Sequence, residues 1–99
     1  KIPKITELDE MFNDCNALTN VNLSNVDLSN ITKYSNVFSY KNIETINLSN
    51  SVMPSNINYL FANITSLKNI NMTNTDLSNT TNIMGLFYEC SGLTHIHQM

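Results

Sequence analysis

The stretch VNLSNVDLSN, residues 21–30, returns 49 residues later as INMTNTDLSN, residues 70–79. Shifting the chain by 49 residues places segment 11–39 over segment 60–88 with 11 of 29 positions identical. The phenylalanines Phe12, Phe38, Phe61 and Phe87 divide this distance further, because they follow one another at spacings of 26, 23 and 26 residues. The duplicated phrase therefore spans two units of a shorter repeat.

Each unit carries the same apolar pattern after its phenylalanine. The pattern reads Leu18-x-x-Val21-x-Leu23, then Ile43-x-x-Ile46-x-Leu48, then Leu67-x-x-Ile70-x-Met72, and finally Leu93-x-x-Ile96. A period in the twenties with this spacing is typical of a leucine-rich solenoid, whose stacked coils bury a continuous core. We therefore expect an α/β leucine-rich repeat solenoid of about 3.5 coils, with parallel strands on the concave face and short helices on the convex face.

The repeat also predicts the domain organisation. The units cover approximately residues 11–36, 37–59, 60–85 and 86–99, and residues 1–10 form a partial leading helix. All 99 residues fit one domain with a modest core. Neither end shows a polar capping unit, so we expect a fragment of a longer array or self-association through the ends.

Apolar residues at spacings of three and four predict two further helices, over 30–40 and over 79–89. Ser or Asn precedes each helix as a candidate N-cap, and the candidate caps are Ser29 or Asn30, Asn56, and Ser78 or Asn79. The predicted core consists of Phe12, Leu18, Val21, Leu23, Phe38, Ile43, Ile46, Leu48, Phe61, Leu67, Ile70, Met72, Phe87, Leu93 and Ile96.

Eighteen asparagines distinguish this chain, and their positions relative to the strands separate them into sets. Asn25, Asn50 and Asn74 lie two residues after an inward Leu or Met, so we expect them to point inward and form an internal ladder. Residues of the opposite parity should face outward from the strands. These are Asn20, Asn22, Thr45, Asn47, Asn69, Asn71, His95 and His97.

The outward residues form the candidate ligand-binding site. They present small, uncharged groups that donate and accept hydrogen bonds along an extended partner. The alternative is a solvated face whose polarity only keeps the sheet soluble. Sequons begin at Asn22, Asn30, Asn47, Asn63, Asn71 and Asn79, and glycans there would cover part of this face in a eukaryotic secretory route.

Composition argues against several other functions. The five lysines are scattered and the net charge is −3, which disfavours binding of nucleic acid, and no apolar run approaches the length of a membrane span.

Cys15 and Cys90 lie three units apart. The spacing between parallel strands places them roughly 15 Å from each other, so free thiols are expected rather than a disulfide. His95 and His97 have no acidic or Cys neighbour, and Gly85 and Gly92 are the only glycines. We predict no metal site, no cofactor and no enzyme activity.

The segments MFNDCNAL (11–18) and LFYECSGL (86–93), with VDLSNIT (26–32) and TDLSNTT (75–81), resemble the BspA-like leucine-rich repeats of bacterial surface proteins. The likeness covers about residues 4–99, although the second unit has Tyr40-Lys41 and the third has Ile64 in place of the Cys. The resemblance implies a cell-surface or secreted module that adheres to a protein partner, for example a surface or matrix protein of a host. The alternatives are a structural spacer that displays another domain and an intracellular leucine-rich repeat scaffold.

Overall fold

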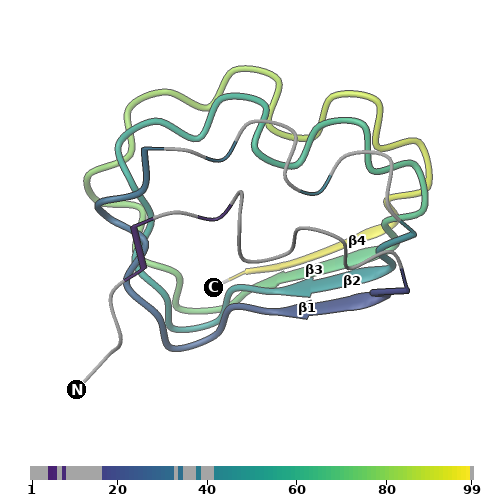
Figure 1. The fold of residues 1–99 in the computed structure, drawn as a ribbon, viewed down its shortest axis with the longest axis horizontal. Coiled ribbons are helices and arrows are strands. Elements are labelled where there is room, and N and C mark those ends of the chain that lie inside the picture. Colours follow the sequence, from purple (N-terminus) through teal and green to yellow (C-terminus); the bar gives the residue numbers. More distant parts are fainter. Residues whose placement is uncertain are drawn as a thin grey trace.

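The computed structural model describes residues 5, 6, 8, 17–32, 34, 38 and 42–98. Four short strands occupy the positions that the repeat predicts: β1 (Asn20–Asn22), β2 (Thr45–Asn47), β3 (Asn69–Met72) and β4 (His95–Gln98). They form one parallel sheet in the order β1-β2-β3-β4 (Figure 1). The register pairs Val21 with Ile46, Ile46 with Ile70, and Ile70 with Ile96, so equivalent positions of successive coils lie side by side.

Backbone hydrogen bonds join the coils on the wall opposite the sheet as well. Residues 57–63 donate to the following coil at every second position, for example from the N–H of Phe61 to the carbonyl of Leu86 (3.1 Å) and from Asn63 to Tyr88 (2.7 Å). Isolated bridges also pair Asp27 with Val52 and Val52 with Asp76. The coils are thus bonded to one another on several sides, and Figure 1 shows them superposed when viewed along their stacking direction.

The helix predicted over 79–89 is absent, and turns take its place. Gly85 and Glu89 have φ angles of 61° and 59°, in the left-handed region, which interrupts a right-handed helix. The carbonyls of Met84, Leu86 and Tyr88 accept from the preceding coil instead of from their own. Of the apolar residues expected on the buried face of this helix, Leu86 and Phe87 do pack against the core, but Ile83 is 61% exposed. The helices predicted over 1–10 and 30–40 lie largely outside the described residues.

Two of the predicted helix caps, Asn56 and Asn79, do not precede a helix among the described residues. Oδ1 of Asn56 accepts from the N–H of Asn58 at 2.9 Å, so Asn56 closes a turn rather than starting a helix. Asn79 is exposed in a turn with no helix after it, and Asn30 is exposed in the first coil. Asp27 and Asp76, which repeat at one place in their units, accept from the N–H groups of Ser29 and Ser78 and so have the turn role that repetition suggests.

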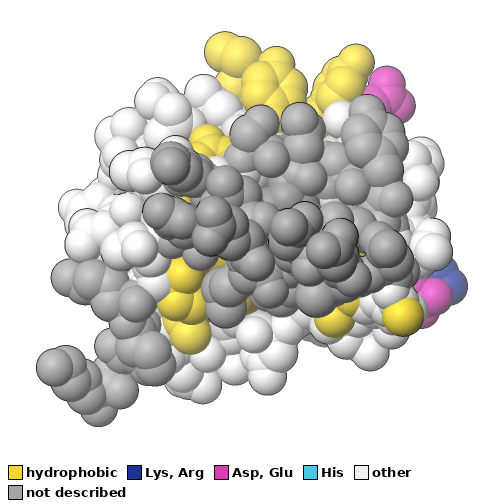
Figure 2. Space-filling view, in the orientation of Figure 1, with side chains coloured by type: hydrophobic (Ala, Val, Ile, Leu, Met, Phe, Trp, Pro, Cys, Tyr) yellow, Lys and Arg dark blue, Asp and Glu magenta, His cyan; other side chains and the backbone are white. Residues whose placement is uncertain are grey.

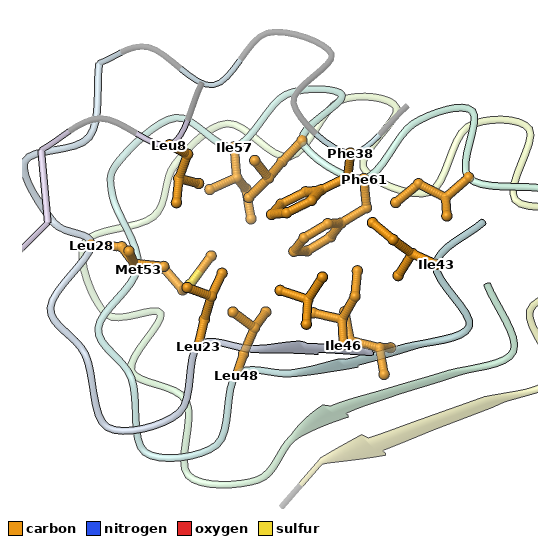
Figure 3. Close-up of a cluster of buried hydrophobic side chains, with 14 of the residues drawn as sticks. Leu8, Leu23, Leu28, Phe38, Ile43, Ile46, Leu48, Met53, Ile57 and Phe61 are labelled. Carbon is orange, nitrogen blue, oxygen red and sulfur yellow. The ribbon is translucent and has the colours of Figure 1, made fainter. Parts of the chain in front are cut away.

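The core lies between the sheet and the opposite wall of turns, residues 57–63 and 82–88, which we call the turn wall (Figure 3). Phe61 stacks between Phe38 and Phe87, with ring centroids 5.9 Å apart on both sides. Ten predicted core residues are buried, namely Val21, Leu23, Phe38, Ile43, Ile46, Leu48, Phe61, Leu67, Ile70 and Met72. Leu18, Phe87 and Leu93 are half-buried and pack against this core, while Phe12 lies outside the described residues. Ile96 was predicted to be buried but is 44% exposed, because no described coil covers the outer side of β4.

The asparagines of the coil corners also differ from the prediction. Asn25, Asn50 and Asn74 are exposed rather than inward, with φ angles of 58°, 60° and 56°. The alternation of a strand ends where the backbone enters the left-handed region, so parity no longer predicts side-chain direction. The backbone joins the coils at this corner, since Asn25 donates to the carbonyl of Ser49 and Asn50 to that of Thr73.

Candidate functional site

The outward side chains of the four strands form the candidate site, which we call the strand face. It consists of Asn20, Asn22, Thr45, Asn47, Asn69, Asn71, His95 and His97. The sheet register aligns these residues in two rows across the coils. One row is Asn20, Thr45, Asn69 and His95, and the other is Asn22, Asn47, Asn71 and His97.

Burial follows the parity that the sequence predicts within the strands. Val21 is 2% exposed between the exposed residues Asn20 and Asn22. The middle residues Thr45, Asn47, Asn69 and Asn71 are half-buried, because a neighbouring strand lies on each side, and His95 is exposed. The side chain of His97 lies outside the described part of the structure. The strand face is therefore accessible along β1, β2 and β3.

The second row has a repeated hydrogen bond that the sequence analysis did not predict. Oδ1 of Asn22, Asn47 and Asn71 accepts from the backbone N–H two residues later, at 3.0, 2.9 and 2.9 Å. Each bond closes an Asx turn at the end of its strand. The signal was present in the sequence as Asn-x-Ser or Asn-x-Thr at the end of each strand pattern.

These turns fix the orientation of the amide groups. With Oδ1 held by the backbone, the Nδ2 group of each asparagine is left to donate outward, and no acceptor for it occurs among the described residues. In the first row, the Thr45 hydroxyl donates to Oδ1 of Asn20. The strand face thus offers oriented hydrogen-bond donors in rows, with neighbouring strands about 4.8 Å apart.

Charged groups adjoin the strand face without forming part of it. Glu44 precedes β2 and Lys68 precedes β3, and both are exposed. Beyond the corner that follows β3, the hydroxyl and the backbone N–H of Ser78 hold the pKa of Asp76 below its ordinary value. The two rows themselves carry no formal charge on β1, β2 or β3.

Cys90 is a free thiol whose Sγ donates to the carbonyl of Phe61 at 2.9 Å. Burial raises its pKa, and a hydrogen bond to the backbone of Ile64 offsets part of that effect. Cys90 packs against the core, as expected for a small hydrophobic residue, whereas Cys15 lies outside the described residues. Among the described residues, no group of three or more His, Cys, Asp and Glu side chains comes together to hold a metal ion.

An apolar surface formed mainly by residues after β3 is the main feature that the sequence analysis missed. Figure 2 shows hydrophobic side chains projecting at one margin of the molecule. The exposed large apolar residues are Tyr59, Leu77, Ile83, Met84, Tyr88 and Ile96. All but Tyr59 belong to the turns and strand that follow β3. In the described part of the chain, no helix is long and apolar enough to cross a membrane.

Stacked parallel strands with a buried apolar repeat define this chain as a leucine-rich solenoid. The model of the BspA-type leucine-rich repeat region, six copies, matches residues 2–99. The chain therefore belongs to the BspA-type leucine-rich repeat family. No curated protein and no solved structure matches the chain.

Proposed function

We propose that this chain is a protein-interaction module that binds its partner through the strand face. The repeated Asx turn supports this function most directly, since it holds the Nδ2 groups of Asn22, Asn47 and Asn71 in one orientation. Membership of a leucine-rich repeat family supports the same class of function. Groups ordered before binding lose less conformational entropy when the complex forms.

The chemistry of the strand face favours an extended, uncharged stretch of a partner. Donors repeat at about the interval between parallel strands, roughly 4.8 Å, and no charge on β1, β2 or β3 steers a strongly charged ligand. An extended segment laid across the strands would supply main-chain carbonyls that accept hydrogen bonds from such donors. The proposed role is one of binding, with no catalytic step.

Substitutions in the first row test this proposal without breaking the Asx turns. We expect Asn20→Lys combined with Asn69→Lys to abolish binding to a panel of purified extracellular matrix and cell-surface proteins, measured by surface plasmon resonance. Asn42→Lys, an exposed change outside the strand face, is the control and should bind like the wild type. Equal binding by the double variant and the control would refute a role for the strand face.

We further propose that the module acts at the cell surface, as an adhesion module, in keeping with its resemblance to bacterial surface proteins. Protease shaving of intact cells that carry the parent protein tests this location. With five lysines and no arginine, trypsin needs a chymotrypsin-like protease beside it. Peptides from this chain in the absence of cytosolic markers would support the proposal. Their appearance only after lysis would replace it with an intracellular scaffold.

A structural spacer is the second candidate, and the same hydrogen bonds favour it. The Asx turns alone explain why asparagine occurs at positions 22, 47 and 71, without any role in binding. Asn47→Asp distinguishes the two, because it keeps the Oδ acceptor of the turn and removes the Nδ2 donor. A binding module should lose affinity for its partner with this change, whereas a spacer should retain both its stability and the display of its neighbouring domain.

A further inference from the structure

Two residues at the turn wall have a backbone conformation that their side chains disfavour. The described residues with a positive φ are Asn or Gly except for Tyr59 and Glu89, whose φ angles are 58° and 59°. The 26-residue spacing of the repeat makes Gly85 the equivalent of Tyr59, and it makes Glu89 the equivalent of Asn63. At both positions, one coil therefore has a residue that suits a left-handed backbone and the other coil does not. Strain of this kind is concentrated at binding sites and other functional sites.

The Tyr59 ring is held at the surface of the molecule. It is 47% exposed, although the turn one repeat later lies beside it in the stack. A Cβ on Gly85 would lie 2.2 Å from this ring, so the glycine of that turn leaves room for it. Tyr88 meets the same ring at a centroid distance of 6.1 Å and an interplanar angle of 81°. These contacts fix the ring between two neighbouring turns, whatever adjoins the second turn on its other side.

Tyr59, Tyr88 and Glu89 form what we call the aromatic corner. The two rings are nearly perpendicular and present aromatic faces in two directions. Glu89 follows Tyr88 directly and is exposed, and among the described residues no cation pairs with its carboxylate. Figure 2 shows an acidic side chain beside the hydrophobic side chains that project at one margin of the molecule. Aromatic faces next to a carboxylate favour a cation.

We propose that the aromatic corner binds an arginine side chain of a partner protein. A guanidinium group stacks on aromatic faces, is more weakly hydrated than an ammonium group, and pairs with a carboxylate through two parallel hydrogen bonds. A purely apolar partner would instead bury the Glu89 carboxylate without a hydrogen-bond partner, which is unfavourable. The net charge of −3 also attracts a basic partner.

The arginine has to come from another protein. These 99 residues contain five lysines and no arginine, so a second copy of them does not supply the guanidinium group. The aromatic corner lies at the turn wall, opposite the sheet, whereas the strand face is formed by the sheet itself (Figure 1). Binding of arginine at this corner is therefore additional to the proposed function, and its test does not depend on the strand face.

Nuclear magnetic resonance titrations of the 99-residue chain with small probes test this proposal. Nα-acetylarginine amide should shift the ring resonances of Tyr59 and Tyr88 and reach saturation in the millimolar range. Nα-acetylcitrulline amide has nearly the same shape but a neutral urea group, so it should bind at least about fivefold more weakly. Nα-acetyllysine amide should also bind more weakly, because its ammonium group lacks the planar fork of donors. All titrations are made at the same ionic strength.

Variants of the corner assign the binding to these residues. Tyr59→Gly removes the ring and places at this position the residue that the next coil has at Gly85. We expect circular dichroism to show a folded variant whose dissociation constant for the arginine probe is at least about fivefold higher. Tyr59→Phe keeps the aromatic face and is the matched control, with an affinity within about twofold of the wild type. Glu89→Gln removes only the charge and should weaken binding about threefold.

Several results would overturn the proposal. The absence of a saturable shift with the arginine probe would show that the corner does not bind this group. Equal binding of the arginine and citrulline probes would show that the positive charge is not recognised. If the lysine probe bound as tightly as the arginine probe, the corner would accept any cation. Wild-type affinity in both Tyr59→Gly and Glu89→Gln would place the bound arginine elsewhere on the molecule.

Discussion

Asn50 occupies a backbone conformation that few residues adopt readily. Its φ is 60°, like the 58° of Asn25 and the 56° of Asn74 at equivalent corners. Asparagine tolerates this left-handed region because its short amide bonds locally, whereas a Cβ without such a group costs roughly 1–2 kcal/mol. The corner therefore selects Asn for its backbone rather than for a side-chain ladder.

A pair of substitutions at this corner should separate backbone strain from other effects. Asn50→Ala should lower the free energy of unfolding by about 1 kcal/mol or more, because Ala resists a positive φ. Asn50→Gly should cost less, since glycine adopts that φ freely and loses only conformational entropy. The backbone N–H that donates to Thr73 is present in both variants. Urea unfolding measures the difference, and equal losses would contradict the strain argument.

The contribution of Cys90 to the stability of the fold should decrease at alkaline pH. Burial raises the pKa of its thiol above the ordinary value of 9.0. A raised folded-state pKa means that the contribution is complete below the unfolded pKa and is lost as the pH rises through the folded pKa. In a Cys15→Ser background, the stability advantage of Cys90 over Cys90→Ala should therefore shrink above about pH 9. Urea unfolding at several pH values checks this, and a constant difference would refute it.

At the candidate site, strand parity was enough to predict which asparagines face outward. It separated the buried Val21 from the exposed Asn20 and Asn22 because side chains alternate strictly within a strand. The same rule failed three residues later at Asn25, where the strand has ended. The Asx turns were not predicted, because the pattern Asn-x-Ser is equally compatible with a glycosylation sequon or with a plain polar face.

The phenylalanine stack is the element that links the coils through the core. Phe61 is fully buried and lies 5.9 Å from both Phe38 and Phe87. Aromatic pairs at such distances contribute beyond the area they bury. The repeat spacing predicted these residues as a set, since each begins a unit.

Truncating the middle ring should cost more than truncating the last one. We expect Phe61→Ala to lower the free energy of unfolding by about 3–5 kcal/mol, as is usual for a large cavity in a core. Phe87→Ala should cost clearly less, because Phe87 is half-buried and, among the described residues, stacks on a single ring. Guanidinium unfolding of both variants compares them. Equal losses would show that the fourth coil is packed as tightly as the third.

The turn wall shows why the helices could not be predicted from spacing alone. Apolar residues three and four apart fit a helix, but Gly85 turns the chain at φ 61° and lies against Tyr59. A Cβ on Gly85 would meet the Tyr59 ring at 2.2 Å, so any other residue would have to displace that ring and also adopt a positive φ. That constraint comes from the neighbouring coil, and a single unit of the repeat does not reveal it.

At the scale of the whole molecule, stability should decline toward the fourth coil. A solenoid is held together mainly by contacts between neighbouring coils, so an end coil with one open side unfolds locally before the middle. The N–H of Leu48 donates to Asn71 of the third coil at 2.8 Å, whereas the N–H of Asn63 donates to Tyr88 of the fourth at 2.7 Å. Opening of the fourth coil would release Asn63 but leave Leu48 bonded.

Hydrogen exchange can follow this difference amide by amide. In the isolated 99-residue chain, the N–H of Asn63 should exchange faster than that of Leu48, despite its slightly shorter hydrogen bond. Nuclear magnetic resonance measures both amides in one sample. If the exchange rates at Asn63 and Leu48 were equal, the coils would unfold as one unit, and the fourth coil would not be the weak point of this stack.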